Sequence, residues 1–191
     1  MTIERRHELE REVARGVRAM LTLAGENPDR EGLSETPARV LKAWYEQTAG
    51  RGQDVSALFK TFQDGTCTGM VMVPSVSFSS LCEHHLMPFM GVAHVAYIPD
   101  GRIVGLSKLA RLVKALARRP QVQERLTVQV VTAITEHLKP KGAACVVRAN
   151  HTCMSCRGVE EPRAEMVTSE LQGCFLHEPE CRAEFMSLVP R

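Results

Sequence analysis

Residues 92–101 read Val92-Ala93-His94-Val95-Ala96-Tyr97-Ile98-Pro99-Asp100-Gly101. A run rich in β-branched and small apolar residues that ends in Pro-Asp-Gly is typical of a strand and the turn that closes it. Upstream of this run, Val76 and Phe78 alternate with serines, which is the period-two pattern of a half-buried strand. The two segments therefore predict two strands of one sheet.

Two amphipathic helices are predicted after the turn, because apolar residues recur there at helical spacing. These residues are Leu106, Leu109, Val113 and Leu116 in the first helix and Val122, Leu126, Val130 and Ile134 in the second. Pro120 separates the two patterns, and we expect it to begin the second helix. Segments 142–149 and 166–171 then predict two more strands.

The predicted order is strand-strand-helix-helix-strand-strand, preceded by helices over 4–24 and 36–48. This order indicates an α+β fold in which two helices lie on one face of an antiparallel sheet. We expect a helical region with a linker over 1–68 and the sheet domain over 69–191. A four-stranded sheet has two open edges, so we also expect several copies of the chain to pair.

Composition excludes several classes of partner. The formal net charge is +2, and the basic residues between 108 and 119 are interpreted as a solvated helix face, so we expect no nucleic-acid partner. No apolar run is long enough to cross a bilayer and the N-terminus is charged, so we expect a cytoplasmic protein without membrane contact. In that compartment the seven cysteines predict metal ligands, nucleophiles or buried thiols rather than disulfides.

Two segments near strand ends carry the residue types that bind metals. They are Ser79-Ser80-Leu81-Cys82-Glu83-His84-His85 and His151-Thr152-Cys153-Met154-Ser155-Cys156-Arg157-Gly158. Together they offer three thiols and three imidazoles, which are ligands that zinc (Zn²⁺) prefers. The sequence therefore predicts a zinc site that joins residues far apart in the chain.

Spacing limits which of these side chains can share one ion. Cys82 and His85 would lie side by side in one helix-like turn, whereas Cys82 and His84 would do so only in extended chain. One of the two adjacent histidines would then bind the metal, and the other would be free for proton transfer. His151 and Cys153 are two residues apart, so both can face one pocket.

Two interpretations of the zinc site stay open at this point. Cys82, a histidine, Cys153 and Cys156 would make a closed, structural site. Alternatively, an open site would use fewer protein ligands and hydrolyse a substrate. The extra imidazoles favour the open site, because a structural zinc needs no nearby acids or bases.

Polar residues at two helix starts indicate an anionic substrate. Ser107, Lys108 and Arg111 follow Gly105 at the start of a helix, where unpaired amides and the helix dipole favour phosphate. Arg157 lies next to the metal-ligand segment. Gln123 and Glu124 begin the next helix, where a Glu is usually a capping residue. A buried carboxylate there could instead accept hydrogen bonds from the N–H groups of a guanine edge.

Several segments resemble those of the GTP cyclohydrolase I family, in order and with similar spacing over residues 30–176. They are Cys82-Glu83-His84-His85, Gly105-Leu106-Ser107-Lys108-Leu109-Ala110-Arg111, Arg119-Pro120-Gln121-Val122-Gln123-Glu124-Arg125-Leu126-Thr127 and His151-x-Cys153-Met154-x-x-Arg157-Gly158-Val159. The resemblance implies the tunnelling fold. It also implies a homodecamer of two stacked pentamers with active sites at subunit boundaries.

The resemblance also implies the function and a role for each site residue. The zinc ligands would be Cys82, His85 and Cys153, with water in the fourth position, and the proton-transfer residues would be His84 and His151. The substrate-binding residues would be Gln123 and Glu124 for guanine, and Ser107, Lys108, Arg111, Arg157 and, from a neighbouring subunit, Arg39 for the triphosphate. GTP would be hydrolysed at C8, with release of formate and formation of 7,8-dihydroneopterin triphosphate, the first step of folate and tetrahydropterin synthesis.

Cys156 departs from the family pattern, which commonly has a small or apolar residue there. If Cys156 also bound zinc, the position for water would close and activity would be lost. Two alternatives to the hydrolase remain. One is a non-catalytic, zinc-stapled oligomer that binds a purine or pterin; the other is a sister tunnelling-fold nitrile reductase, against which the three predicted zinc ligands argue.

Overall fold

The N-terminal helices form a compact unit of their own. The computed structural model describes residues 1–63 and 67–190, and it divides the chain into compact units between Thr48 and Ala49. The first unit contains α1 (Ile3–Leu23), α2 (Glu31–Ser34) and α3 (Thr36–Gln47), which confirms the helices predicted over 4–24 and 36–48. The hydroxyl of Tyr45 on α3 donates to the carboxylate of Glu10 on α1 over 2.5 Å.

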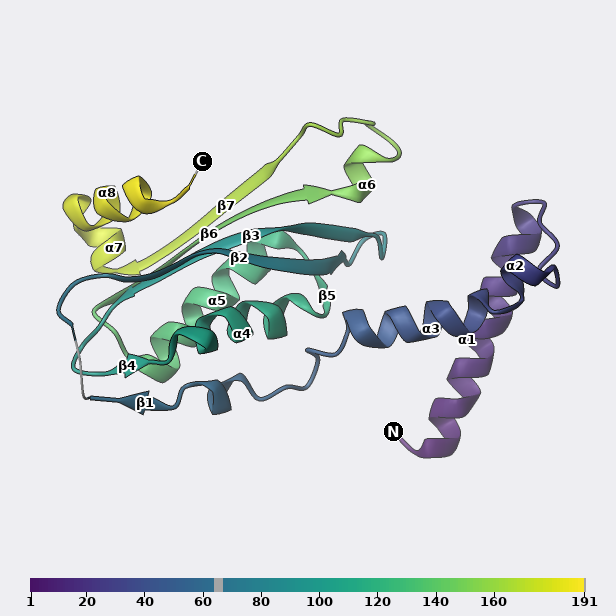
Figure 1. The fold of residues 1–191 in the computed structure, drawn as a ribbon, viewed down its shortest axis with the longest axis horizontal. Coiled ribbons are helices and arrows are strands. Elements are labelled where there is room, and N and C mark those ends of the chain that lie inside the picture. Colours follow the sequence, from purple (N-terminus) through teal and green to yellow (C-terminus); the bar gives the residue numbers. More distant parts are fainter. Residues whose placement is uncertain (64–66, 191) are drawn as a thin grey trace. The chain divides into compact units, whose positions relative to one another are not determined.

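The second unit is a sheet with helices on both of its faces. Its elements are η1 (Val55–Leu58), β1 (Thr61–Phe62), β2 (Val71–Cys82), β3 (Pro88–Ile98), β4 (Ile103–Val104), α4 (Leu106–Ala117), β5 (Pro120–Gln121), α5 (Gln123–Leu138), β6 (Gly142–His151), α6 (Thr152–Ser155), β7 (Met166–Gly173), α7 (Cys174–His177) and α8 (Pro179–Leu188). The main sheet has the order β5-β2-β3-β6-β7, and its four long strands are antiparallel. The α+β class is therefore confirmed (Figure 1).

Helices α4 and α5 lie on one face of the sheet (Figure 1), and α7 and α8 pack on the opposite face. Alternate residues of β3 show this division. Ala93, Val95 and Tyr97 belong to the core beneath α4 and α5, whereas Ala96 packs with Phe175 of α7 in a second, smaller core. Strand β3 is therefore buried on both faces along its second half.

Two features of the sheet domain differ from the sequence prediction. Pro120 does not begin a helix: Pro120 and Gln121 form β5, which pairs in parallel with Leu81 and Cys82 of β2, and α5 begins at Gln123. Proline tolerates this edge position because it has no N–H to leave unpaired. The C-terminal residues form two helices, α7 and α8, that no sequence pattern predicted.

The register of β3 brings the two predicted metal-ligand segments together. On one side, Leu81 of β2 lies opposite Pro88, and on the other, His151 of β6 lies opposite Phe89. The end of β2 and the end of β6 therefore meet at the start of β3. The predicted division of the chain into domains between residues 68 and 69 remains a prediction. Within the part of the chain that is described, no helix is both long and apolar enough to cross a membrane.

A matched pair of valines on α5 tests the position of the core. Val130 is fully buried beneath the sheet, whereas Val128 is 44% exposed on the same helix. Val130→Ala should lower the free energy of unfolding by about 2 kcal/mol, because it removes two buried methyl groups and leaves a small cavity. Val128→Ala should change it by less than about 0.5 kcal/mol. Urea unfolding measures both; equal losses would contradict the packing described.

Candidate metal centre and catalytic cavity

A tight turn after β2 places the first two predicted ligands together. The Cys82 amide donates to the carbonyl of Met87 over 2.8 Å, and the Leu86 amide donates to the carbonyl of Cys82 over 2.8 Å. The chain between them therefore makes one helix-like turn, and Leu86 closes it with a positive φ of 54°. Residues three apart face the same side in such a turn, so His85 lies beside Cys82, as its spacing predicts.

Cys82, His85 and Cys153 form one cluster. Their ligand atoms all lie within 4.8 Å of one another, with Sγ of Cys82 3.8 Å from Nδ1 of His85 and 4.0 Å from Sγ of Cys153. Zinc–ligand bonds of about 2.0–2.3 Å in a tetrahedron place neighbouring ligand atoms roughly 3.3–3.8 Å apart, so small side-chain movements close the site. Two thiols and an imidazole are donors that suit zinc, and this group could hold a metal ion.

Cys156 does not belong to this cluster. It ends the short helix α6, where its amide donates to the carbonyl of Thr152 over 3.0 Å, and its side chain is exposed. The four-protein-ligand site considered from the sequence is therefore absent from the described geometry. Burial and the neighbouring Cys82 raise the pKa of the Cys153 thiol, while the charge of Arg157 opposes that rise.

His84 and His85 diverge, as expected for adjacent residues. Their rings are 6.2 Å apart and nearly perpendicular, at 82°. Nδ1 of His84 lies 3.9 Å from Sγ of Cys82, but His84 is not part of the cluster with Cys153. One imidazole is thus available as a metal ligand and the other remains beside the site.

His151 is held rigidly at the end of β6. Its ring stacks on Phe89 of β3 at 4.5 Å with an interplanar angle of 4°. Its Nε2 lies 2.9 Å from Oε1 of Gln123. Burial lowers the pKa of His151, while the carboxylate of Glu124 acts in the opposite direction. Phe89 had no predicted role, because a stacking partner depends on strand register, which the sequence does not show.

Gln123 is fully buried, and both polar atoms of its side chain have hydrogen-bond partners within the protein. Its side-chain NH₂ donates to the carbonyls of Val147 and Met166 over 3.1 and 3.0 Å. These two bonds fix the orientation of the carboxamide, so its oxygen is the atom that faces His151. The side chain of Gln123 therefore positions His151 and ties α5 to β6 and β7.

These side chains surround one cavity of about 190 Å³. It is lined by Cys82, His84, His85, Gln121, Val122, Gln123, Glu124, His151, Cys153, Met154 and Met166. Glu124 is the acidic residue of this set. The cavity is smaller than the roughly 300–1,000 Å³ of typical ligand pockets, so one chain encloses only a small ligand or part of a larger one.

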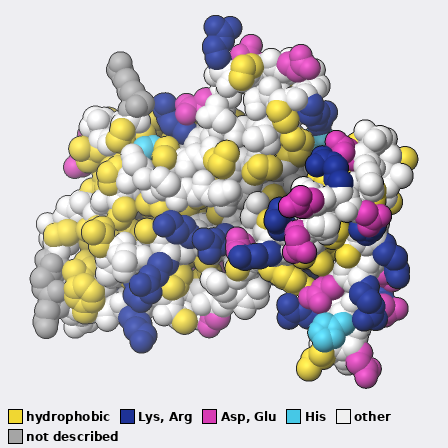
Figure 2. Space-filling model, turned by 45° about the vertical axis from the view of Figure 1, so that its right-hand side comes forward, with side chains coloured by type: hydrophobic (Ala, Val, Ile, Leu, Met, Phe, Trp, Pro, Cys, Tyr) yellow, Lys and Arg dark blue, Asp and Glu magenta, His cyan; other side chains and the backbone are white. Residues whose placement is uncertain are grey.

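The predicted phosphate-binding residues of the second unit lie outside this cavity. Ser107, Lys108 and Arg111 occupy the first two turns of α4, whose first helical amides have no side-chain cap. Arg157 is exposed just after α6, and Arg39 lies on α3 in the first unit. Figure 2 shows basic and acidic side chains interspersed over much of the visible face, in agreement with the small net charge.

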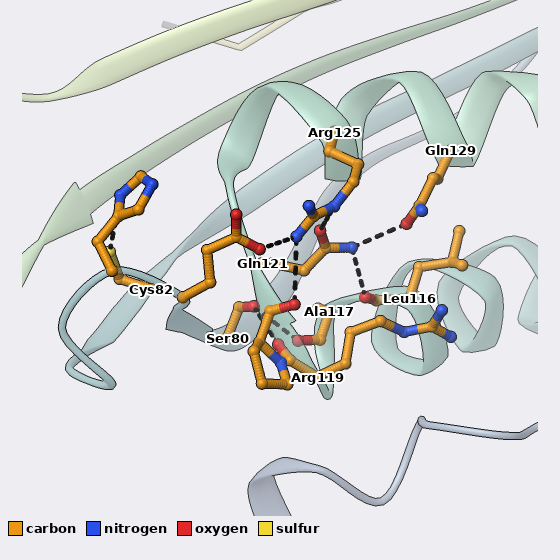
Figure 3. A network of polar contacts seen from close by, with 11 residues as sticks. Ser80, Cys82, Leu116, Ala117, Arg119, Gln121, Arg125 and Gln129 are labelled. Carbon is orange, nitrogen blue, oxygen red and sulfur yellow. Dashed lines mark hydrogen bonds and ion pairs between the residues drawn. The ribbon is translucent and has the colours of Figure 1, made fainter.

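A polar network holds the turn after β2 against α5 (Figure 3). Arg125 donates to the carboxylate of Glu83 and, over 2.8 Å, to Oε1 of Gln121. Gln121 is completely buried, and its amide donates to Gln129 over 2.8 Å and to the carbonyl of Leu116 over 3.1 Å. Arg125 also holds the pKa of the Glu83 carboxyl below its usual range. No role in the site was predicted for Glu83, Gln121 or Arg125.

Comparisons with known proteins agree with the resemblance. The family model for GTP cyclohydrolase I matches residues 13–190. GTP cyclohydrolase 1 of Thermobifida fusca is 52% identical over 179 residues, covering 93% of this chain and 86% of the relative. The enzymes of the same name from Thermoanaerobacter pseudethanolicus and Listeria monocytogenes are 49% and 46% identical, each over 93% of this chain and 95% and 94% of the relative.

Two cysteine variants test the composition of the metal cluster. Cys153→Ser should reduce bound metal to less than about a tenth of an ion per chain, because a serine hydroxyl is a poor ligand. Cys156→Ser should retain the wild-type metal content, because Cys156 lies outside the cluster. Elemental analysis after brief dialysis against a chelator measures both. Loss of metal in Cys156→Ser would show that the exposed thiol is a ligand.

Proposed function

This chain belongs to the GTP cyclohydrolase I family, and from that premise we propose that it hydrolyses the purine ring of GTP at C8, releasing formate and forming 7,8-dihydroneopterin triphosphate. The observation that carries the proposal is the cluster of Cys82, His85 and Cys153 with two further histidines in the same cavity. A structural metal site would need no such histidines, whereas ring hydrolysis requires proton transfer beside the metal.

Zinc is the proposed metal, held by Cys82, His85 and Cys153. Two sulfur donors and one imidazole favour zinc over the harder ions magnesium and calcium, which prefer oxygen. Zinc bound by three protein ligands would lower the pKa of a water in its open position to about 7, which would supply a nucleophile at neutral pH. The donor set of this chain fits that role, because Cys156 lies outside it.

His151 and His84 are the proposed proton-transfer residues. C8 of a purine is a poor electrophile until N7 is protonated, so an acid must lie near that atom. The Gln123 oxygen can only accept a hydrogen bond, so Nε2 of His151 carries a proton in the neutral ring. Burial lowers the pKa of His151 and so favours the neutral ring, which can take up a proton and return it.

Glu124 is the proposed anchor for the guanine. Its carboxylate lies in the cavity wall at the first turn of α5, where it can accept hydrogen bonds from the N–H groups of a guanine edge. The side-chain amide of Gln123 is already engaged. We therefore propose that Gln123 contributes to guanine binding only through its backbone N–H, which lies at the start of α5 and has no helical partner.

The triphosphate requires residues that one chain does not bring to the cavity. We propose that Ser107, Lys108 and Arg111 of a neighbouring copy complete the pocket, together with Arg157 and Arg39. The cavity of about 190 Å³ and the open edges of β2 and β7 both support completion by further copies. A decamer of two stacked pentamers, as the family assembles, and a cytoplasmic location belong to the same proposal.

Replacing His151 separates catalysis from metal binding. His151→Ala should lower kcat for GTP by roughly 10²–10⁴-fold, because a positioned acid–base group is lost. Its metal content should stay at the wild-type level, since His151 is not in the cluster. The pterin product, oxidised to its fluorescent form, and formate report turnover.

His177→Ala is the matched control, because His177 lies on α7, away from this cavity. Its turnover should equal that of the wild type. Loss of metal in His151→Ala would make His151 a ligand instead of an acid. Binding of GTP by metal-loaded wild-type protein without pterin or formate would favour the non-catalytic binding module.

A further inference from the structure

The turn that carries two of the proposed metal ligands has few links to the rest of the protein. Residues Glu83, His84, His85 and Leu86 are all exposed. Within the described part of the chain, the Glu83 carboxylate makes the one side-chain hydrogen bond that connects segment 83–86 to a helix. The Glu83 amide adds a backbone bond of 3.0 Å to the carbonyl of Gln121. Both links end at residues 121–125.

Contacts other than the one with Glu83 hold the side chain of Arg125 in place. Its Nε donates to the buried Gln121 over 2.8 Å, and its guanidinium also reaches the carbonyl of Pro120 over 3.3 Å. In Figure 3, Arg125, Gln121 and Gln129 point toward one another from α5 and β5. A guanidinium fixed in this way loses little further entropy when it binds a carboxylate.

We propose that Arg125 is a positioning residue for the metal site, acting through Glu83 to hold the turn that carries Cys82 and His85 at the correct distance from Cys153. The inference rests on the proposed function, in which these three side chains bind zinc. Gln123, two residues earlier, holds His151 on the other side of the cavity. Residues 121–125 therefore fix both halves of the site from one short segment.

A direct electrostatic effect on the ion would behave differently from positioning. Glu83 is negative and Arg125 positive, so through-space interaction predicts that removing Glu83 weakens zinc binding and that removing Arg125 strengthens it. Positioning predicts that both removals weaken zinc binding, because each releases the same turn. The sign of the Arg125 effect therefore separates the two explanations.

The ion pair itself should contribute little to global stability. The side chains of Arg125 and Glu83 are 41% and 35% exposed, and exposed ion pairs are worth little in folding. A merely structural role would appear as a lower melting temperature with unchanged metal affinity in the folded protein. A positioning role appears as weaker metal affinity at an unchanged melting temperature of the metal-free protein.

The test measures zinc affinity of the purified full-length protein by competition with a chromophoric chelator. Arg125→Met and Glu83→Ala should each weaken zinc binding by about tenfold, the lower end of the range for residues that orient metal ligands. The double variant should be no weaker than either single variant, because both break the same link. The zinc affinity of Arg125→Lys should fall between those of Arg125→Met and the wild type, since lysine keeps the charge but lacks the planar guanidinium with its several donors.

Arg163→Met is the matched control, because it removes an Arg–Glu ion pair in which Arg163 is 92% exposed. The proposal would be overturned if Arg125→Met bound zinc as tightly as this control or more tightly. Additive losses of affinity in the double variant would also overturn it. Wild-type protein that binds zinc but leaves GTP unchanged would contradict the proposed function alone, since the affinity comparison would still decide the role of Arg125.

Discussion

The register of one strand determines the whole site. Pro88 and Phe89, at the start of β3, lie opposite Leu81 on one side and His151 on the other. The hydroxyl of Thr152 also donates to the carbonyl of Pro88 over 2.6 Å, which joins α6 to the same point. Cys82 follows directly after Leu81, and Cys153 directly after Thr152. A shift of one residue in this register would send each side chain to the opposite face and separate the proposed metal ligands.

The rest of the domain serves to hold that register. The core beneath α4 and α5 buries one face of β3, and the smaller core of α7 and α8 buries part of the other face. At Gly91 the strands approach so closely that a Cβ atom would lie 1.9 Å from the carbonyl of Arg148. Residues 121–125 then connect the two halves of the cavity from the side of α5. Packing, close strand approach and polar links thus all help to hold Cys82, His85 and Cys153 near one another.

Much of this arrangement could be predicted from the sequence. Period-two and helical patterns gave the order of the long strands and helices, and the spacing of Cys82 and His85 gave their common orientation. Pro120 was misassigned because a proline before a helical pattern usually starts the helix, whereas here tertiary pairing with Leu81 forms β5. The roles of Phe89 and Arg125 could not be predicted, because they depend on contacts between segments far apart in the chain. The place of the predicted phosphate-binding residues could not be predicted either, because we propose that further copies of the chain bring them to the cavity.

X-ray absorption at the zinc edge of the loaded protein decides whether the site is open, because it counts the atoms bound to the ion. For a site made of Cys82, His85 and Cys153 we expect two sulfur atoms at about 2.3 Å and two lighter atoms at about 2.0–2.1 Å, one of them an imidazole nitrogen and the other exchangeable with added anions. A third sulfur atom, or four protein atoms that no added anion displaces, would contradict an open site and with it the proposed hydrolysis.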